Sequence, residues 1–163
     1  CMDDLGLSVI EPFLFRVTRE GNVYAAGSFF SGQGADVAEW VPVSEPVEPG
    51  DVLELDLDTV GFYRKARGPS SRLVVGVVAN SPGLILGKLR AERKALLALV
   101  GTVLVKATAE NGSIRPGDLL VSASTPGYAM RCLEPKACEG AIIGKALEPL
   151  LAGVGLIRML ATH

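Results

Sequence analysis

The sequence repeats one short pattern twice, and this repetition restricts the possible folds more than any other feature. Three stretches of the first half recur in the same order in the second half, at offsets of 67, 66 and 68 residues. Each copy reads as an entry turn at Pro-Gly-Asp, a strand, a crossing strand and a buried strand interrupted by glycine. We therefore predict an internal duplication of one β module, over approximately residues 41–87 and 101–161. The matching stretches are residues 47–53 with 114–120, residues 61–66 with 127–132, and residues 74–78 with 142–146.

Each Pro-Gly-Asp sequence has the composition of a tight turn. Proline presets its φ angle, glycine supplies unusual backbone angles, and aspartate can bond the backbone two residues further on. Gly50, Asp51, Gly117 and Asp118 are therefore predicted to be structural turn residues rather than catalytic ones. The predicted fold is mainly β, with two tandem similar modules of a β-clip-like kind, an extended β arm before them and little helix.

The phenylalanine-rich beginning of the chain is predicted to be a separate arm. Residues 12–30 read as two short strands about a turn at Gly21-Asn22, because apolar and other residues alternate with period two. A lone two-stranded ribbon is marginal in water, so the arm packs either in its own core or against other copies of the chain. We favour oligomerisation through residues 1–31, with residues 32–163 as the β domain. The predicted interface residues are Phe13, Phe15, Val23, Phe29, Phe30 and Trp40.

The stretch Val52 to Asp58 alternates between leucine and acidic residues. We expect Leu53, Leu55 and Leu57 to face the core, and Glu54, Asp56 and Asp58 to face water. Neighbours on one face of a strand stand about 6.6–6.8 Å apart, which is too far to surround one cation, so no metal site is predicted there. Residues 88–98 have the only helix-favouring composition; the alternative is a charged loop that leads into a strand from Leu97.

Composition excludes several classes of protein. The net charge is −2, and no basic cluster is flanked by stacking aromatics, so nucleic-acid binding is not expected. No apolar run approaches the roughly 20 residues of a membrane span, and no targeting signal is visible. The one histidine is His163, so no zinc site or other cofactor is expected. Cys132 and Cys138 are expected to be buried free thiols; a disulfide between them in an oxidising compartment is the alternative.

Residues 32–40, Gly-Gln-Gly-Ala-Asp-Val-Ala-Glu-Trp, hold the candidate chemistry. Asp36 and Glu39 could form an acid–base pair that activates water at a nearby peptide bond, with Trp40 as an apolar wall. In the structural alternative, Asp36 bonds the backbone of a turn, Glu39 pairs with an arginine and Trp40 lies at an interface. The N-terminal thiol of Cys1 is a further candidate nucleophile.

These motifs, taken together, resemble a known group of proteins. Gly21-Asn22-Val23-Tyr24, the Asp-x-Ala-Glu sequence at 36–39, the Pro-Gly-Asp turn at 49–51 and the segment 111–128 occur in the order of the C-terminal domains of bacterial and phage fibre or tail-appendage proteins. Among these are intramolecular-chaperone domains, some of which are glutamic-type self-processing peptidases. The resemblance implies a trimeric β-rich cap that sets the register of an elongated fibre. In the self-cleaving members we expect an aromatic residue where this chain has Val37.

Three functions follow as hypotheses. The first is an assembly domain of an extracellular or virion-type fibre, which forms a homotrimer, caps the fibre and contacts its upstream segment. The second is a self-processing peptidase that uses Asp36 and Glu39. The third is a carbohydrate-binding β module whose two Pro-Gly-Asp units frame a groove for surface carbohydrate. The first places the protein outside the cell or on the surface of a particle.

Overall fold

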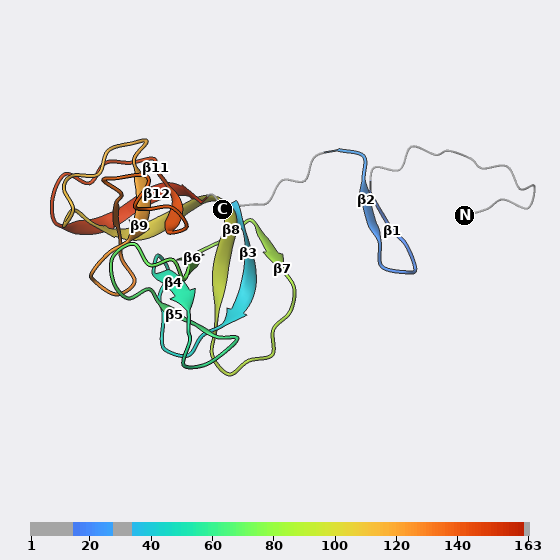
Figure 1. Ribbon diagram of the computed structural model, residues 1–163. Coiled ribbons are helices and arrows are strands. Elements are labelled where there is room, and N and C mark those ends of the chain that lie inside the picture. The colour runs from blue at the N-terminus through green and yellow to red at the C-terminus, as the bar shows by residue number, and fades with distance from the viewer. Residues whose placement is uncertain (1–14, 28–33, 162–163) are drawn as a thin grey trace, which may run out of the picture. The chain divides into compact units, whose positions relative to one another are not determined.

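The computed structural model describes residues 15–27 and 34–161 of the chain (Figure 1). The chain divides into two units, Cys1–Ser31 and Gly32–His163. Twelve strands make up the regular structure of the described residues, and none of these residues is helical. The prediction of a mainly β chain with little helix is confirmed.

The first unit contains a β-hairpin. Strands β1 (Phe15–Val17) and β2 (Val23–Ala25) pair antiparallel, with Phe15 opposite Ala25. Thr18 N donates to Asn22 O at 2.9 Å, and Gly21 N donates to Thr18 O at 3.0 Å, which closes the turn. Gly21 has a φ of +87°, an angle that glycine adopts without steric cost. Every residue of both strands is exposed.

The second unit is one sheet of ten strands, in which β8 is the longest. The order of pairing is β10-β9-β11-β12-β8-β6-β4-β5, and β3 pairs with both β8 and β7. The strands are β3 (Ala35–Pro42), β4 (Val52–Leu55), β5 (Tyr63–Lys65), β6 (Val74–Val78), β7 (Leu84–Leu86), β8 (Lys94–Thr108), β9 (Leu119–Ser122), β10 (Ala129–Arg131), β11 (Ile142–Ala146) and β12 (Val154–Ala161).

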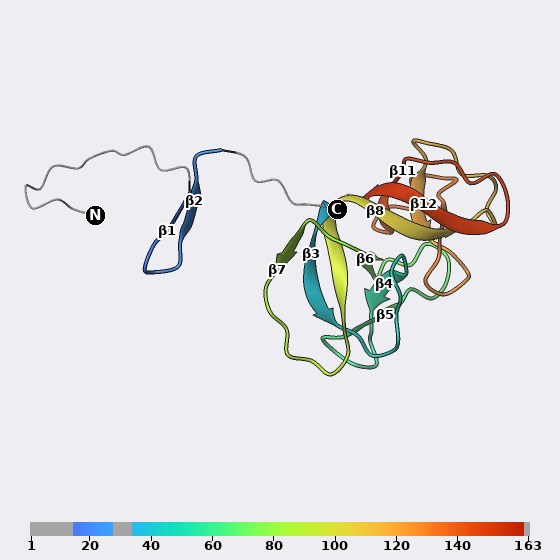
Figure 2. The ribbon, with the colours of Figure 1, turned by 180° about the vertical axis from the view of Figure 1, so that it is seen from behind.

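The sheet closes on itself twice, and β8 is shared by the two closed groups. In the first group, β8 leads through β6, β4 and β5 to a parallel bridge between Tyr63 and Val43, which follows β3, and β3 pairs with β8 again. In the second, β8 leads through β12, β11, β9 and β10 back to β8 by a parallel bridge between Ala129 and Ala107. Figure 2 shows β8 running from the β3–β7 side into the β11–β12 side. The core lies inside both groups.

The predicted orientation of the acidic strand is wrong at four positions. Leu53 is buried as expected, but Leu55 and Leu57 are exposed. Glu54 and Asp56 are buried, because Arg64 on the neighbouring strand β5 pairs with both of them. Arg64 Nε lies 3.1 Å from Glu54 Oε1, and Arg64 Nη1 lies 3.3 Å from Asp56 Oδ1. The face that was expected to be solvated is thus an internal ion-pair cluster, and only Asp58 reaches the solvent.

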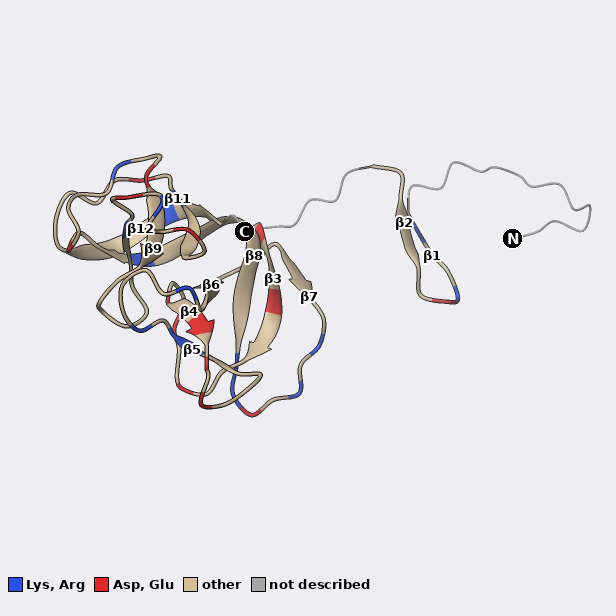
Figure 3. Cartoon of the chain, viewed as in Figure 1, with Lys and Arg blue, Asp and Glu red and all other residues tan. Residues whose placement is uncertain are grey.

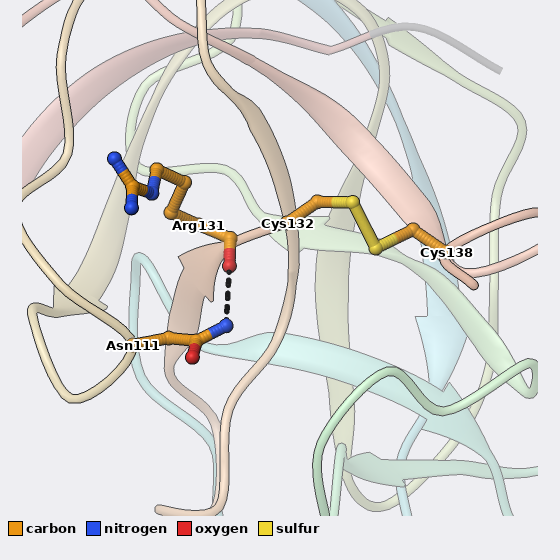
Figure 4. Close-up of a disulfide and its surroundings, with 4 residues drawn as sticks. All are labelled: Asn111, Arg131, Cys132 and Cys138. Carbon is orange, nitrogen blue, oxygen red and sulfur yellow. Dashed lines mark hydrogen bonds between the residues drawn. A yellow bond between two sulfur atoms is a disulfide. The ribbon is translucent and has the colours of Figure 1, made fainter. Parts of the chain in front are cut away.

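Two local expectations had alternatives that the structure resolves. Residues 88–93 are not helical, and strand β8 begins at Lys94, so the loop-and-strand alternative is confirmed with an earlier start than Leu97. Cys132 and Cys138 form a disulfide, with their Cα atoms 6.3 Å apart, so the expectation of free thiols is wrong for this pair and the alternative is confirmed. Figure 4 shows the disulfide next to Arg131, whose carbonyl accepts a 3.0 Å hydrogen bond from Asn111 Nδ2.

Candidate functional site

The candidate carboxylates Asp36 and Glu39 both lie on strand β3. Successive side chains of a strand point to opposite faces, so two residues three positions apart point away from each other. The irregularity in the β3–β8 pairing lies between Val37 and Ala38, and its extra residue is on β8, so β3 keeps its alternation. Asp36 therefore shares a face with Trp40, and Glu39 lies on the other face. Strand β3 of one chain does not bring the two carboxylates together.

Asp36 is a buried acid at the edge of a pocket. Its side chain lines a cavity of about 390 Å³ together with Asn80, Ser81 and Arg158. Among the residues that the structure describes, no group donates a hydrogen bond to Asp36 Oδ2. Burial raises the pKa of Asp36, and a backbone hydrogen bond to the carboxylate opposes this in part. Asp36 also accepts a 2.8 Å bond from Gly83 N through its backbone carbonyl, which fixes the turn after β6 against β3.

Trp40 is partly exposed, and the ammonium group of Lys94 lies over its ring. Lys94 Nζ lies 4.4 Å from the centroid of the Trp40 ring, within the range of a cation–π interaction. The adjacent loop between β7 and β8 contains Lys88, Arg90 and Arg93, and Figure 3 marks its basic positions in blue. Trp40 and Lys94 thus form one surface of the first closed group.

The aspartate of the first Pro-Gly-Asp turn is buried and binds two lysines. Asp51 Oδ2 accepts a 2.8 Å bond from Glu48 N, within the turn, and Gly50 has a φ of +88°. Asp51 Oδ1 also accepts a 2.7 Å bond from Lys106 Nζ, and Lys65 Nζ lies 3.3 Å from Asp51 Oδ2. Lys106 lies in the part of β8 that pairs with β12, which is in the second closed group. The Asp51 carboxylate, 1% exposed, therefore joins the two groups.

The second Pro-Gly-Asp turn has the same internal bonds but lies at the surface. Asp118 Oδ2 accepts a 2.8 Å bond from Arg115 N, and Gly117 has a φ of +97°. Arg131 Nη1 is 4.0 Å from Asp118 Oδ2, and 28% of the Asp118 side chain is exposed. The aspartate of the first turn is thus buried, and that of the second is partly exposed.

Sequence reasoning did not find Lys65 and Lys106. A signal existed for Lys65, because it stands 66 residues before Arg131, within the repeat. Lys106 has no such signal, since its contact with Asp51 spans 55 residues and depends on the tertiary fold.

The predicted interface residues of the arm are exposed where the structure describes them. Phe15 is 60% exposed and Val23 is 56% exposed. Phe13, Phe29 and Phe30 lie outside the described residues. The interface role of these residues stays a prediction.

Neither a metal site nor a membrane-spanning helix is found in the described part of the chain. In residues 15–27 and 34–161, no three His, Cys, Asp or Glu side chains are grouped so that they could hold a metal ion. Over the same residues, no helix has the length and hydrophobicity needed to cross a membrane.

Comparison with known proteins gives a relation at the level of the fold. No protein-family model matches the sequence, and no curated protein matches it. The structure is similar to the crystal structure of the pre-mature bacteriophage phi29 gene product 12, with a TM-score of 0.66 and 14% sequence identity. The similarity covers 88% of this chain and 24% of that chain, so this chain spans about a quarter of that protein's length. This chain therefore shares its fold with part of a bacteriophage protein.

Proposed function

We propose that this chain is an assembly domain of a virion-type fibre or tail appendage, in which three copies associate and cap the fibre. The fold shared with a bacteriophage protein supports a place on the virion. The observation that carries the self-association is the hairpin of β1 and β2, in which every residue is exposed, including Phe15, Val17, Val23 and Tyr24. An apolar ribbon of this size is unstable alone in water and is stabilised by packing against other copies.

The proposed cap consists of two tandem β modules, one for each closed group. Matching hydrogen bonds support this duplication. Gly50 N donates to Val78 O at 2.9 Å, and Gly117 N donates to Ala146 O at 2.8 Å. The pairing of β4 with β6 has an irregularity in which the residue directly before Gly76 has no partner on β4. The pairing of β9 with β11 has the same irregularity directly before Gly144.

Light scattering of the full chain tests the self-association. We expect a mass three times the 17.1 kDa of one chain. Replacement of both Phe15 and Val23 by serine should shift the protein towards the monomer, because the arm then loses its apolar surface. Val100→Ser is the matched control, since Val100 is also an exposed apolar residue but lies on β8. A wild-type monomer at micromolar concentration would contradict the proposal.

A second candidate is a self-processing peptidase. Two observations favour it: the buried Asp36, whose raised pKa suits a general acid, and the pre-mature form in which the phi29 protein was solved. In this candidate, one carboxyl group protonates the leaving amide nitrogen while the other carboxylate takes a proton from the attacking water. Because Asp36 and Glu39 point to opposite faces of β3, the pair would combine residues of two chains.

Intact-mass spectrometry of the purified chain tests this second candidate. Self-processing predicts a discrete cut before Gly32 that disappears in Asp36→Asn or in Glu39→Gln. Glu45→Gln is a control, because Glu45 pairs with Arg67 away from β3. A wild-type chain that stays intact during prolonged incubation would exclude the peptidase and leave the assembly function unaffected.

A further inference from the structure

The two closed groups are joined by one turn that inserts against another. The receiving turn is Glu48–Asp51, and the inserted turn is Thr125–Tyr128. Val52 N donates to Gly127 O at 2.8 Å, and Gly127 N donates to Ala66 O at 3.0 Å. The fit is close, because a Cβ atom on Gly127 would lie 2.9 Å from Asp51 Oδ1. The chain therefore contains one complete example of this joint.

A second receiving turn is present and uncovered. It is Arg115–Asp118, whose internal bonds match those of the first receiving turn. A Cβ atom on Gly50 would meet Leu156 Cδ2 at 3.1 Å, whereas on Gly117 it would meet nothing within 4 Å. Cys132 N donates to Leu119 O as Ala66 N donates to Val52 O, both at 2.8 Å, so Cys132 holds the place of Ala66.

A second turn of the inserted kind is also present, and in the described part of this chain it is inserted nowhere. It is Thr59–Phe62, in which Phe62 N donates to Thr59 O at 3.0 Å, as Tyr128 N donates to Thr125 O at 3.1 Å. Gly61 has a φ of +86°, close to the +78° of Gly127, and nothing lies within 4 Å of a Cβ atom placed on it. Val60 in this turn is 91% exposed, the largest exposed fraction among the large apolar side chains of the described residues.

The internal joint also contains a lysine–aspartate pair, and the uncovered surfaces offer one lysine and one aspartate at corresponding places. In the internal joint, Lys106 of β8 lies opposite Leu156 of β12, and its Nζ donates to Asp51. In the duplication, the bridge Val43–Tyr63 corresponds to the bridge Ala107–Ala129. Pro42 precedes Val43 as Lys106 precedes Ala107, so the pair Pro42–Lys94 between β3 and β8 corresponds to the pair Lys106–Leu156. The lysine has moved to the other strand of the pair. Lys94 is exposed, and its Nζ, which lies over the Trp40 ring and donates a 3.2 Å bond to Leu89 O, gives up these contacts in the joint.

We propose that copies of this chain associate head to tail, with Thr59–Phe62 of one copy inserted against Arg115–Asp118 of the next copy. Lys94 of the inserting copy then pairs with Asp118, as Lys106 pairs with Asp51 inside the chain. This rests on the proposed self-association and names an interface for it. Such an interface uses two different surfaces, so it closes into a ring when the rotation allows and three copies form a trimer.

The intermolecular joint is expected to be weaker than the internal one. Lys106 N donates a 2.9 Å bond to Gly50 O, and Pro42, which holds the corresponding place, has no N–H. Glu48, which binds Lys106 at 2.7 Å, corresponds to Arg115, which repels Lys94. The joint between copies is thus reversible and depends on concentration.

Zero-length cross-linking with a carbodiimide tests this interface in the full chain. Equal amounts of 14N- and 15N-labelled protein are mixed, cross-linked and digested, and the linked peptides are identified by mass. We expect Lys94–Asp118 links that combine both labels. The internal Lys106–Glu48 link should carry one label only, which shows that the chemistry works on a 2.7 Å ion pair whose carboxylate is exposed.

Matched variants give the decisive comparison. Gly61→Trp should remove the mixed-label Lys94–Asp118 link, because the bulky side chain blocks insertion. Gly153→Trp should keep it, since Gly153 also has a positive φ, +70°, with nothing within 4 Å of an added Cβ atom, and lies outside both turns. An oligomer without the link, or with the link in Gly61→Trp, overturns the inference but leaves the assembly function. A monomer overturns both.

Discussion

Replacing Asp51 with alanine is expected to lower the free energy of unfolding by roughly 3–5 kcal/mol, the usual loss when one partner of a buried ion pair is removed. The substitution leaves Lys65 and Lys106 without their shared carboxylate and removes the bond from Glu48 N. The joint between the two closed groups would lose its central acceptor. Denaturant-induced unfolding at one fixed protein concentration measures this change.

The chain supplies its own control at the second turn. Asp118→Ala removes the same bond within the turn, from Arg115 N, but only a loose contact with Arg131 at 4.0 Å. The expected loss is therefore about 1 kcal/mol, that of one partly exposed hydrogen bond. Equal losses in the two variants would show that Lys65 and Lys106 contribute little, and that the first turn is not a hub.

The second large effect is expected at Gly101, where β3 and β8 approach most closely. Gly101 has a φ of +112°, and an added Cβ atom would run into the carbonyl oxygen of Ala35 and lie 2.7 Å from Asp36 Cα. Gly101→Ala combines about 1–2 kcal/mol of backbone strain with about 1–3 kcal/mol of overpacking. We expect a total loss of roughly 2–5 kcal/mol, visible as a lower thermal midpoint.

Gly153→Ala separates the two causes. Gly153 has a φ of +70° but open space around it, so only the backbone strain of about 1–2 kcal/mol applies. If Gly101→Ala and Gly153→Ala lower the thermal midpoint equally, the close approach of β3 to β8 contributes nothing.

The parts of the fold that local chemistry determines could be predicted from the sequence. Pro-Gly-Asp specifies a turn within four residues, and the bonds from Glu48 N to Asp51 and from Arg115 N to Asp118 lie inside that span. The hairpin of β1 and β2 follows from alternation and from Gly21. These features need no knowledge of distant residues.

The features that failed depend on contacts between distant strands. Alternation indicates which of residues 53–58 share a face, but not which face is covered. Arg64, on another strand, makes the acidic face the buried one. Strand β7 (Leu84–Leu86) was missed because its three apolar residues do not alternate with polar ones.

The candidate site shows the same limit. Asp36 and Glu39 are close in sequence, and spacing alone does not say whether they converge. Residues three apart share a face of a helix and lie on opposite faces of a strand. The sequence of residues 32–40 did not settle which element they form, and the structure places both carboxylates on β3.

Hydrogen exchange followed by mass spectrometry at increasing protein concentration tests most directly the central claim, that this domain assembles with copies of itself, and it also tests the interface inferred between the β modules. Segments 59–62 and 115–119 should exchange more slowly as the concentration rises, while Val52 and Gly127, already bonded within the chain, stay protected throughout. If both segments exchange at one rate at every concentration and the chain stays monomeric, the claim is wrong. One rate in a chain that is oligomeric would exclude only the interface between the modules.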